Sequence, residues 1–131
     1  MNNKFIITQL LILFYQVVYG QNYTTGWFSG SIYNIKEPRG IVVASNGIIY
    51  FSDSKNHQIK KLNSDGTIEI IAGTGNQGFA DGSGKTAQFS DPTAITMDNE
   101  GNLYVADASN HRIRKIDKSG VVSTVAGASV N

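Results

Sequence analysis

The glycine-rich stretch GTGNQGFADGSGKTAQF, at residues 73–89, carries two patterns that could hold a phosphate group. Gly73, Gly75 and Gly78 have the G-x-G-x-x-G spacing of a dinucleotide-binding loop, in which backbone N–H groups approach a pyrophosphate. The triplet GKT at 84–86 has the form of the end of a P-loop. These residues therefore raise the question of nucleotide binding.

The surroundings of both patterns argue against a nucleotide. A P-loop needs a glycine five residues before Gly84, and that position is Phe79. A dinucleotide loop must open a helix, where Gly82 and Gly84 would each cost about 1 kcal/mol. We therefore interpret the stretch as a connector and expect no cofactor.

Histidine and carboxylate side chains recur in the chain and could bind a metal ion. They are His57 and His111, and Asp53 and Asp107, each aspartate being followed three residues later by an asparagine. A surface histidine at a turn is the simpler interpretation of each histidine, and Asp and Asn side chains commonly cap the backbone of tight turns. Ligands of one ion must converge, whereas these histidines should lie apart toward the rim, so we expect no metal site. No nucleophile stands beside a base, so we expect no catalytic residue.

Composition argues against a polyanion-binding protein and against a disulfide-stabilised one. The chain has 131 residues, with 11 basic and 10 acidic side chains, a net charge of +1 and no cysteine. Such a balance does not favour a polyanion, and stability must come from packing rather than disulfides. A basic set is interleaved with acids, and no aromatic residue is expected to stack beside it, so we expect a solvated strand surface and no nucleic-acid partner. It comprises Lys60, Lys61, Arg112, Arg114, Lys115 and Lys118.

The first 20 residues, MNNKFIITQLLILFYQVVYG, predict a signal peptide. Lys4 precedes an apolar run from Phe5 to Val18, which is too short and too interrupted for a membrane span. We expect cleavage near Gly20 and a secreted, extracellular or, in a bacterium, periplasmic protein. Asn22 begins a glycosylation sequon that matters only in a eukaryotic host.

An internal repeat dominates the rest of the chain. Residues 38–73 and 92–127 align without a gap at an offset of 54, and 12 of 36 positions are identical. Ordinary residue frequencies would give about two identities. The predicted organisation is therefore a signal peptide, a lead-in at 21–37, two repeats, a connector at 74–91 and a tail at 128–131.

Each repeat predicts four short strands separated by turn residues. In the second repeat these strands are 94–97, 103–106, 112–116 and 121–126. The second strand of each repeat is apolar on both faces, which predicts cover on both sides, whereas the third is more polar and should lie outward. Ile113 and Ile116 are three residues apart, which predicts a bulge or strand end. The expected fold is all-β: two four-stranded antiparallel blades of an incomplete β-propeller.

The same residues resemble a known family. A proline and an isoleucine strand are followed by GNLYVAD at 101–107, NHRIRKI at 110–116, Gly120 and the pair AG at 126–127, which is similar to the NHL repeat. The first repeat has Gln58 where the family usually has arginine. The resemblance implies blades of a six-bladed propeller, of the kind found in extracellular and cytoplasmic interaction proteins. Similar DG…A.F..P connectors are common in secreted NHL proteins.

Function follows from this architecture as an expectation. We expect a non-catalytic binding or scaffolding module for a protein, glycan or peptide partner, with Arg39, Thr93 and Thr96 near the axial strands as its ligand contacts. The alternative is a fragment of a metal-dependent propeller enzyme, resembling an amidating lyase or a lactonase. An enzyme of either type should lose its metal ion to a chelator.

Two blades cannot close a ring, and repeat arrays generally need three or more units to bury their faces. Two explanations stay open. Either further blades belong to a longer parent chain, or three copies of this chain close a six-bladed ring.

Overall fold

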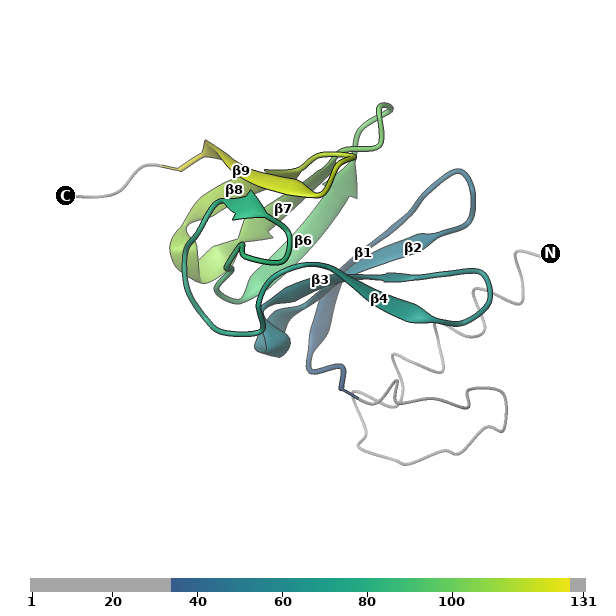
Figure 1. The fold of residues 1–131 in the computed structure, drawn as a ribbon, viewed down its shortest axis with the longest axis horizontal. Coiled ribbons are helices and arrows are strands. Elements are labelled where there is room, and N and C mark those ends of the chain that lie inside the picture. Colours follow the sequence, from purple (N-terminus) through teal and green to yellow (C-terminus); the bar gives the residue numbers. More distant parts are fainter. Residues whose placement is uncertain (1–33, 128–131) are drawn as a thin grey trace. The chain divides into compact units, whose positions relative to one another are not determined.

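The computed structural model describes residues 34–127, and all of the strands described below lie in one compact unit that begins at Lys36. The first antiparallel sheet has the order β1-β2-β3-β4 (Figure 1). Its strands are β1 (Pro38–Val43), β2 (Ile49–Asp53), β3 (Gln58–Leu62) and β4 (Ile68–Ala72), with the 3-10 turn η1 (Ser54–Asn56) after β2.

The second sheet repeats this order and gains one strand. It runs β5-β9-β8-β7-β6, so that a short strand from the connector covers its outer edge. Its strands are β5 (Gly82–Ser83), β6 (Pro92–Met97), β7 (Leu103–Asp107), β8 (Arg112–Ile116) and β9 (Val121–Ala126), with the 3-10 turn η2 (Ala108–Asn110) after β7. The prediction of two four-stranded antiparallel units is confirmed.

Glycine turns join the strands within each sheet. In the β6–β7 hairpin the Gly101 N–H donates to the Asp98 carbonyl at 3.0 Å, and in the β8–β9 hairpin Gly120 donates to Asp117 at 2.9 Å. Both glycines have φ above +80°, a conformation that costs glycine least. These tight turns keep consecutive strands side by side.

A bulge interrupts the pairing of the third strand in each sheet. The register of β8 with β9 shifts between Ile113 and Arg114, and that of β3 with β4 shifts between Ile59 and Lys60. The predicted irregularity in this part of the chain is confirmed. Ile116 is buried while Ile113 is exposed, because side chains three residues apart on a strand point to opposite faces.

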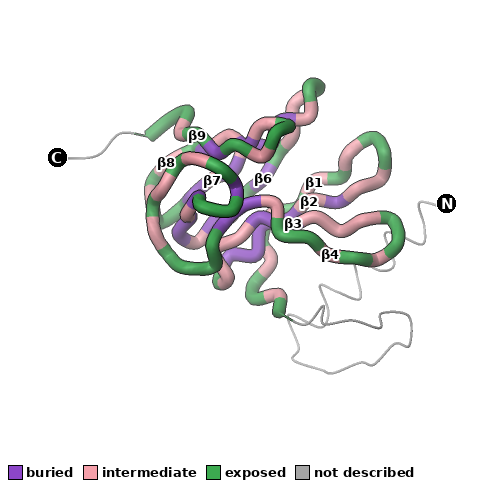
Figure 2. Tube along the Cα trace, in the orientation of Figure 1, coloured by how far each residue is buried: buried purple, intermediate pink, exposed green. Residues whose placement is uncertain are grey.

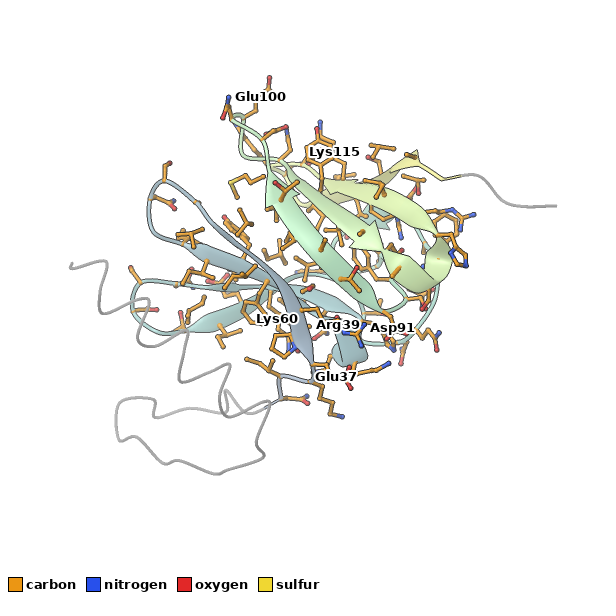
Figure 3. The ribbon with its side chains drawn as sticks, turned by 180° about the vertical axis from the view of Figure 1, so that it is seen from behind. Glu37, Arg39, Lys60, Asp91, Glu100 and Lys115 are labelled. Carbon is orange, nitrogen blue, oxygen red and sulfur yellow. The ribbon has the colours of Figure 1, made fainter. Side chains whose placement is uncertain are left out.

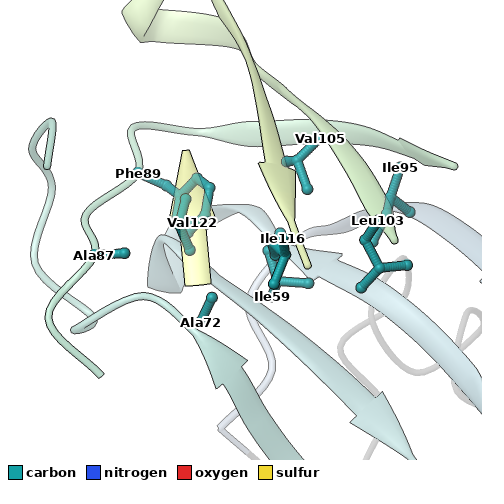
Figure 4. Packing of buried hydrophobic residues seen from close by; sticks show 9 residues of the cluster. All are labelled: Ile59, Ala72, Ala87, Phe89, Ile95, Leu103, Val105, Ile116 and Val122. Carbon is teal, nitrogen blue, oxygen red and sulfur yellow. The ribbon is translucent and has the colours of Figure 1, made fainter. Parts of the chain in front are cut away.

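The main hydrophobic core lies between the two sheets. Buried residues gather along the middle strands, whereas hairpin tips are exposed (Figure 2). Phe89 and Ala87 of the connector are fully buried in this core. The cluster, drawn in Figure 4, comprises Ile59, Ala72, Ala87, Phe89, Ile95, Leu103, Val105, Ile116 and Val122.

The first strands of the two sheets, β1 and β6, lie side by side. A Cβ atom at Gly40 would overlap the Thr93 carbonyl oxygen, so this approach requires glycine. The Ser52 hydroxyl donates to the same carbonyl at 2.5 Å, and the Ser54 hydroxyl donates to the Pro92 carbonyl. The sheets are therefore joined by polar bonds as well as by the core.

Several predictions fall outside the described residues. These are the signal peptide at 1–20, its cleavage near Gly20, the sequon at Asn22, most of the lead-in and the tail at 128–131. Within residues 34–127, no helix is long and apolar enough to cross a membrane.

Candidate functional site

The glycine-rich stretch uses its backbone donors within the protein. Gly73 donates to the Gly84 carbonyl at 3.0 Å, Gly78 to Phe89 at 3.0 Å, and Gly84 to Gly120 at 2.8 Å. Donors that are already bonded to carbonyls are not free to hold a phosphate. This geometry supports the interpretation of the stretch as a connector between blades.

A buried aspartate anchors each repeat. Asp107 accepts hydrogen bonds from the Ser90 N–H at 2.7 Å, from Asn110 Nδ2 at 2.8 Å and from Arg114 at 2.7 Å. Neither it nor its counterpart in the first repeat caps the following 3-10 turn with its side chain. The predicted turn-capping role is thus wrong in detail, because the acceptor atoms hold the segment that enters the first strand.

The first repeat contains the same arrangement. Asp53 accepts from the Lys36 N–H at 2.7 Å, from Asn56 Nδ2 at 2.8 Å and from Lys60 Nζ at 2.5 Å. Both aspartates are fully buried. Their place in the interior, with an internal cation beside each, gives them a structural role.

The prediction that the third strands present a solvated basic surface is wrong for two residues. Lys60 and Arg114 are buried, because each pairs with the buried aspartate of its own repeat. Arg114 also donates to the Gln88 carbonyl at 2.9 Å and to Asp81 at 2.7 Å. Partial burial raises the pKa of the Asp81 carboxyl, but bonds from Arg114 and Thr124 outweigh this and lower it overall.

Aromatic rings do lie beside the basic set, contrary to the sequence expectation. The Arg112 guanidinium is 4.0 Å from the centre of the Phe79 ring, and Arg114 is 4.8 Å from the same ring. Phe79 comes from the connector, which the sequence could not place against the third strand. Arg114 is fully buried, so this contact serves packing.

The predicted ligand contacts fall in two places. Arg39 lies on β1 and is exposed. Thr93 lies on β6, is half-buried, and approaches Gly40 of β1. Thr96 is also exposed, but it follows Ile95, whose side chain is in the core. Because side chains alternate along a strand, Thr96 points to the face of the second sheet that is turned away from the first. Ligand contact by all three residues stays a prediction.

Two ion pairs lie near the points where the chain enters the first strand of each sheet. Arg39 pairs with Glu37 at 2.9 Å and Lys55 pairs with Asp91 at 3.0 Å. Figure 3 shows Glu37, Arg39 and Asp91 at one end of the strands and Glu100 at the other. We call the four residues Glu37, Arg39, Lys55 and Asp91 the charged rim. A hydrogen bond from Lys55 holds the pKa of Asp91 below its ordinary value.

The backbone at the charged rim is strained at equivalent positions. Glu37 and Asp91 have φ of 54° and 49°, although each precedes a proline, which disfavours the helical conformations. The Ser54 N–H donates to the Glu37 carbonyl at 3.3 Å, and the Asp91 N–H donates to His57 Nδ1 at 3.2 Å. An acidic residue precedes both Pro38 and Pro92, and this repeated pair is the sequence feature that marks the charged rim.

The two histidines occupy equivalent turns. His57 and His111 follow η1 and η2 and have φ of 53° and 52°. Among residues 34–127 there is no group of three or more His, Cys, Asp or Glu side chains that could hold a metal ion.

The NHL repeat family model matches residues 36–62 and 89–116, one match in each sheet. The chain is 44% identical over 84 residues to the Arabidopsis thaliana protein SUPPRESSOR OF QUENCHING 1, chloroplastic, which covers 63% of this chain and 8% of that protein. It is 37% identical over 87 residues to NHL repeat-containing protein 2 of Bos taurus, covering 66% of this chain and 12% of that protein. The chain thus spans only a small part of both relatives.

Solved structures match the same region. A structural genomics protein from Bacteroides thetaiotaomicron VPI-5482 is 31% identical with a TM-score of 0.64, covering 77% of this chain and 26% of that one. An auxiliary nutrient binding protein from the same organism is 26% identical with a TM-score of 0.58, and a streptogramin B lyase is 26% identical with a TM-score of 0.51. Each of these two matches covers 66% of this chain and 25% of the other. The chain thus contains two NHL repeats, one in each of its two β-propeller blades.

Proposed function

We propose that this chain is part of an exported NHL propeller that binds a protein, glycan or peptide partner without converting it. The observation that carries the proposal is the charged rim. Four charged side chains lie where both sheets receive their first strand, on segments that the buried aspartates hold in place. A rigid frame with exposed charges is suited to recognition.

The charges of the rim indicate what kind of partner it fits. Two carboxylates are paired with two cations, so the rim has no net charge to attract a polyanion. A partner with both donors and acceptors, such as a peptide backbone or a sugar, could exchange with the exposed Arg39–Glu37 pair. Exposed ion pairs contribute only about 0.2 to 1 kcal/mol, so exchanging one costs little.

The comparison with known structures supports the same proposal. The nutrient binding protein is a binding protein by its name, and this chain resembles it over two sheets. Export is part of the proposal and rests on residues 1–20. Mass spectrometry of the protein recovered from the medium or periplasm of a producing cell tests it, since cleavage should leave a chain that begins near Gln21.

A lyase is the second candidate, and the similarity to the streptogramin B lyase favours it. Residues 34–127 contain no cluster of side chains that could hold a metal ion. A metal-dependent lyase would therefore need ligands from outside this range. The two candidates differ in their response to a chelator.

Binding of the fluorescently labelled chain to peptide and glycan arrays, with and without a chelator, tests the proposal. We expect chelator-independent retention that falls at least fivefold in the variant Arg39→Ala with Lys55→Ala. Lys85→Ala, an exposed lysine on the connector, is the matched control and should bind normally. Retention that disappears with the chelator would favour the lyase, and retention unchanged in the double variant would remove the rim from the proposal.

A further inference from the structure

A concave site lies between the two blades and contains none of the charged-rim residues. It has a volume of about 320 Å³ and is lined by β2, β3 and β4 of the first sheet and by the hairpin turns of the second. Figure 1 shows the β6–β7 hairpin and the strands of the first sheet diverging on this side. The volume is at the lower end of the range for small-ligand pockets. We call it the inter-blade cleft.

Tyr50 provides a free donor to this cleft. Its counterpart in the second repeat, Tyr104, donates its hydroxyl to Asp98 at 3.2 Å. In the first repeat the position of Asp98 is occupied by Ala44, so that bond cannot form. Within the described residues the Tyr50 hydroxyl has no protein partner, and Tyr50 lines the cleft.

Lys118 provides a cation from the opposite wall. Its side chain lies over Gly101, where a Cβ atom would be 3.5 Å from Lys118 Cε. Among the residues that the structure describes, its ammonium group has neither an ion pair nor a hydrogen bond. A ligand carboxylate could therefore pair with Lys118 without displacing a protein group.

Carboxylates lie in the same cleft. Glu69 pairs with Lys61 at 3.2 Å, and Asp117 accepts the Ser119 hydroxyl at 2.6 Å. Hydrogen bonds from Asn63 and then Lys61 lower the pKa of Glu69, and the bond from Ser119 lowers that of Asp117, so both are ionised at neutral pH. The lining thus contains two cations and two anions, which disfavours a ligand that carries charge of one sign.

One wall of the cleft is apolar. Ile71, Leu103 and Ile116 line it, and Ile71 is partly buried where it packs against the inter-sheet core. The cleft therefore presents an aliphatic surface beside its charged groups.

We propose that the inter-blade cleft binds a small zwitterion with an apolar side chain, such as an apolar amino acid or dipeptide. Tyr50 and Lys118 receive its carboxylate, Glu69 and Asp117 receive its ammonium group, and Ile71 contacts its side chain. Both signs of charge beside an aliphatic wall match this ligand better than a neutral sugar or a simple anion. The cleft shares no residue with the charged rim, so either proposal can fail without the other.

Isothermal titration of the full chain with L-leucyl-L-leucine tests the proposal. We expect saturable binding that weakens at least fivefold in Tyr50→Phe and in Lys118→Met. The matched controls are Tyr104→Phe, whose hydroxyl is bound to Asp98, and Lys85→Met on the connector, and both should bind like the parent chain. Thermal unfolding of each variant checks that the fold is retained.

Three results would overturn the proposal. They are no binding up to about 10 mM, equal weakening by Tyr50→Phe and Tyr104→Phe, and equally tight binding of the uncharged analogue N-acetyl-leucinamide. Binding of glucose in place of the dipeptide would assign the cleft to neutral sugars and would also contradict it.

Discussion

At the residue scale, the protein places an arginine–aspartate ion pair in its interior. Arg114 is fully buried. Its guanidinium donates to Asp107, to the exposed Asp81 and to two backbone carbonyls, those of Ala80 and Gln88. Removing one partner of a buried pair leaves the other charge without compensation and typically costs about 3 to 5 kcal/mol. We expect Arg114→Met to lose stability of this size, measured as the free energy of unfolding in urea.

Lys115→Met is the control for that measurement. Lys115 lies 5.8 Å from the Tyr104 ring and is only partly buried, so we expect a loss of about 0.5 to 1 kcal/mol. A similar loss in both variants would mean that the Arg114 network contributes no more than a surface contact.

The spacing of charged residues in the sequence indicates this ion pair, although the polar character of the third strand suggests exposure instead. In both repeats a cation follows the strand-ending aspartate by seven residues, at Lys60 after Asp53 and at Arg114 after Asp107. A polar strand read alone predicts exposure, because charged residues are usually solvated. Only the register of β7 with β8, which places Arg114 beside Val105 on the buried face, shows otherwise.

At the element scale, the strands and turns could be predicted because glycine and alternating apolar residues mark them locally. The strand β5 could not, since Gly82 and Ser83 have no strand propensity. Its pairing with Val121 and Val122 depends on the open edge of β9, which is a property of the folded sheet. The cleft between blades likewise depends on how two repeats meet, and no single repeat encodes it.

Glycine at the end of β4 gives a prediction at this scale. Gly73 has φ of +103°, and a Cβ atom there would overlap the His57 carbonyl oxygen. Gly120 also has a positive φ, of +84°, but a Cβ atom there has nothing within 4 Å. Each alanine substitution therefore has the conformational cost of about 1 to 2 kcal/mol, and only Gly73→Ala adds a steric overlap.

We expect Gly73→Ala to be clearly less stable than Gly120→Ala in thermal unfolding. Equal melting temperatures would mean that the chain around His57 relaxes without cost, and that the close approach of the blade end to η1 does not constrain the fold.

At the scale of the whole molecule, the second sheet presents a copy of a surface that the first sheet buries. Tyr50 and Ile59 of the first sheet pack into the inter-sheet core. Their counterparts Tyr104 and Ile113 lie on the far face of the second sheet, with Ile113 40% exposed. Val125 is 49% exposed, and its counterpart in the first sheet, Ile71, packs against the core. A repeat that uses one face to pack on its neighbour has the same apolar face available once more.

This repeated face predicts association, either with another copy of the chain or with further blades of a longer protein. We expect the mass of the chain, measured by light scattering, to rise with concentration, and Val125→Asp to shift it toward that of a monomer. Ser64→Asp adds the same charge at an exposed hairpin position and should leave the mass unchanged. A limiting mass of three chains would favour the closed six-bladed ring. A mass that stays monomeric at all concentrations would mean that the face does not recognise another copy, and would leave a blade from a longer parent chain as its partner.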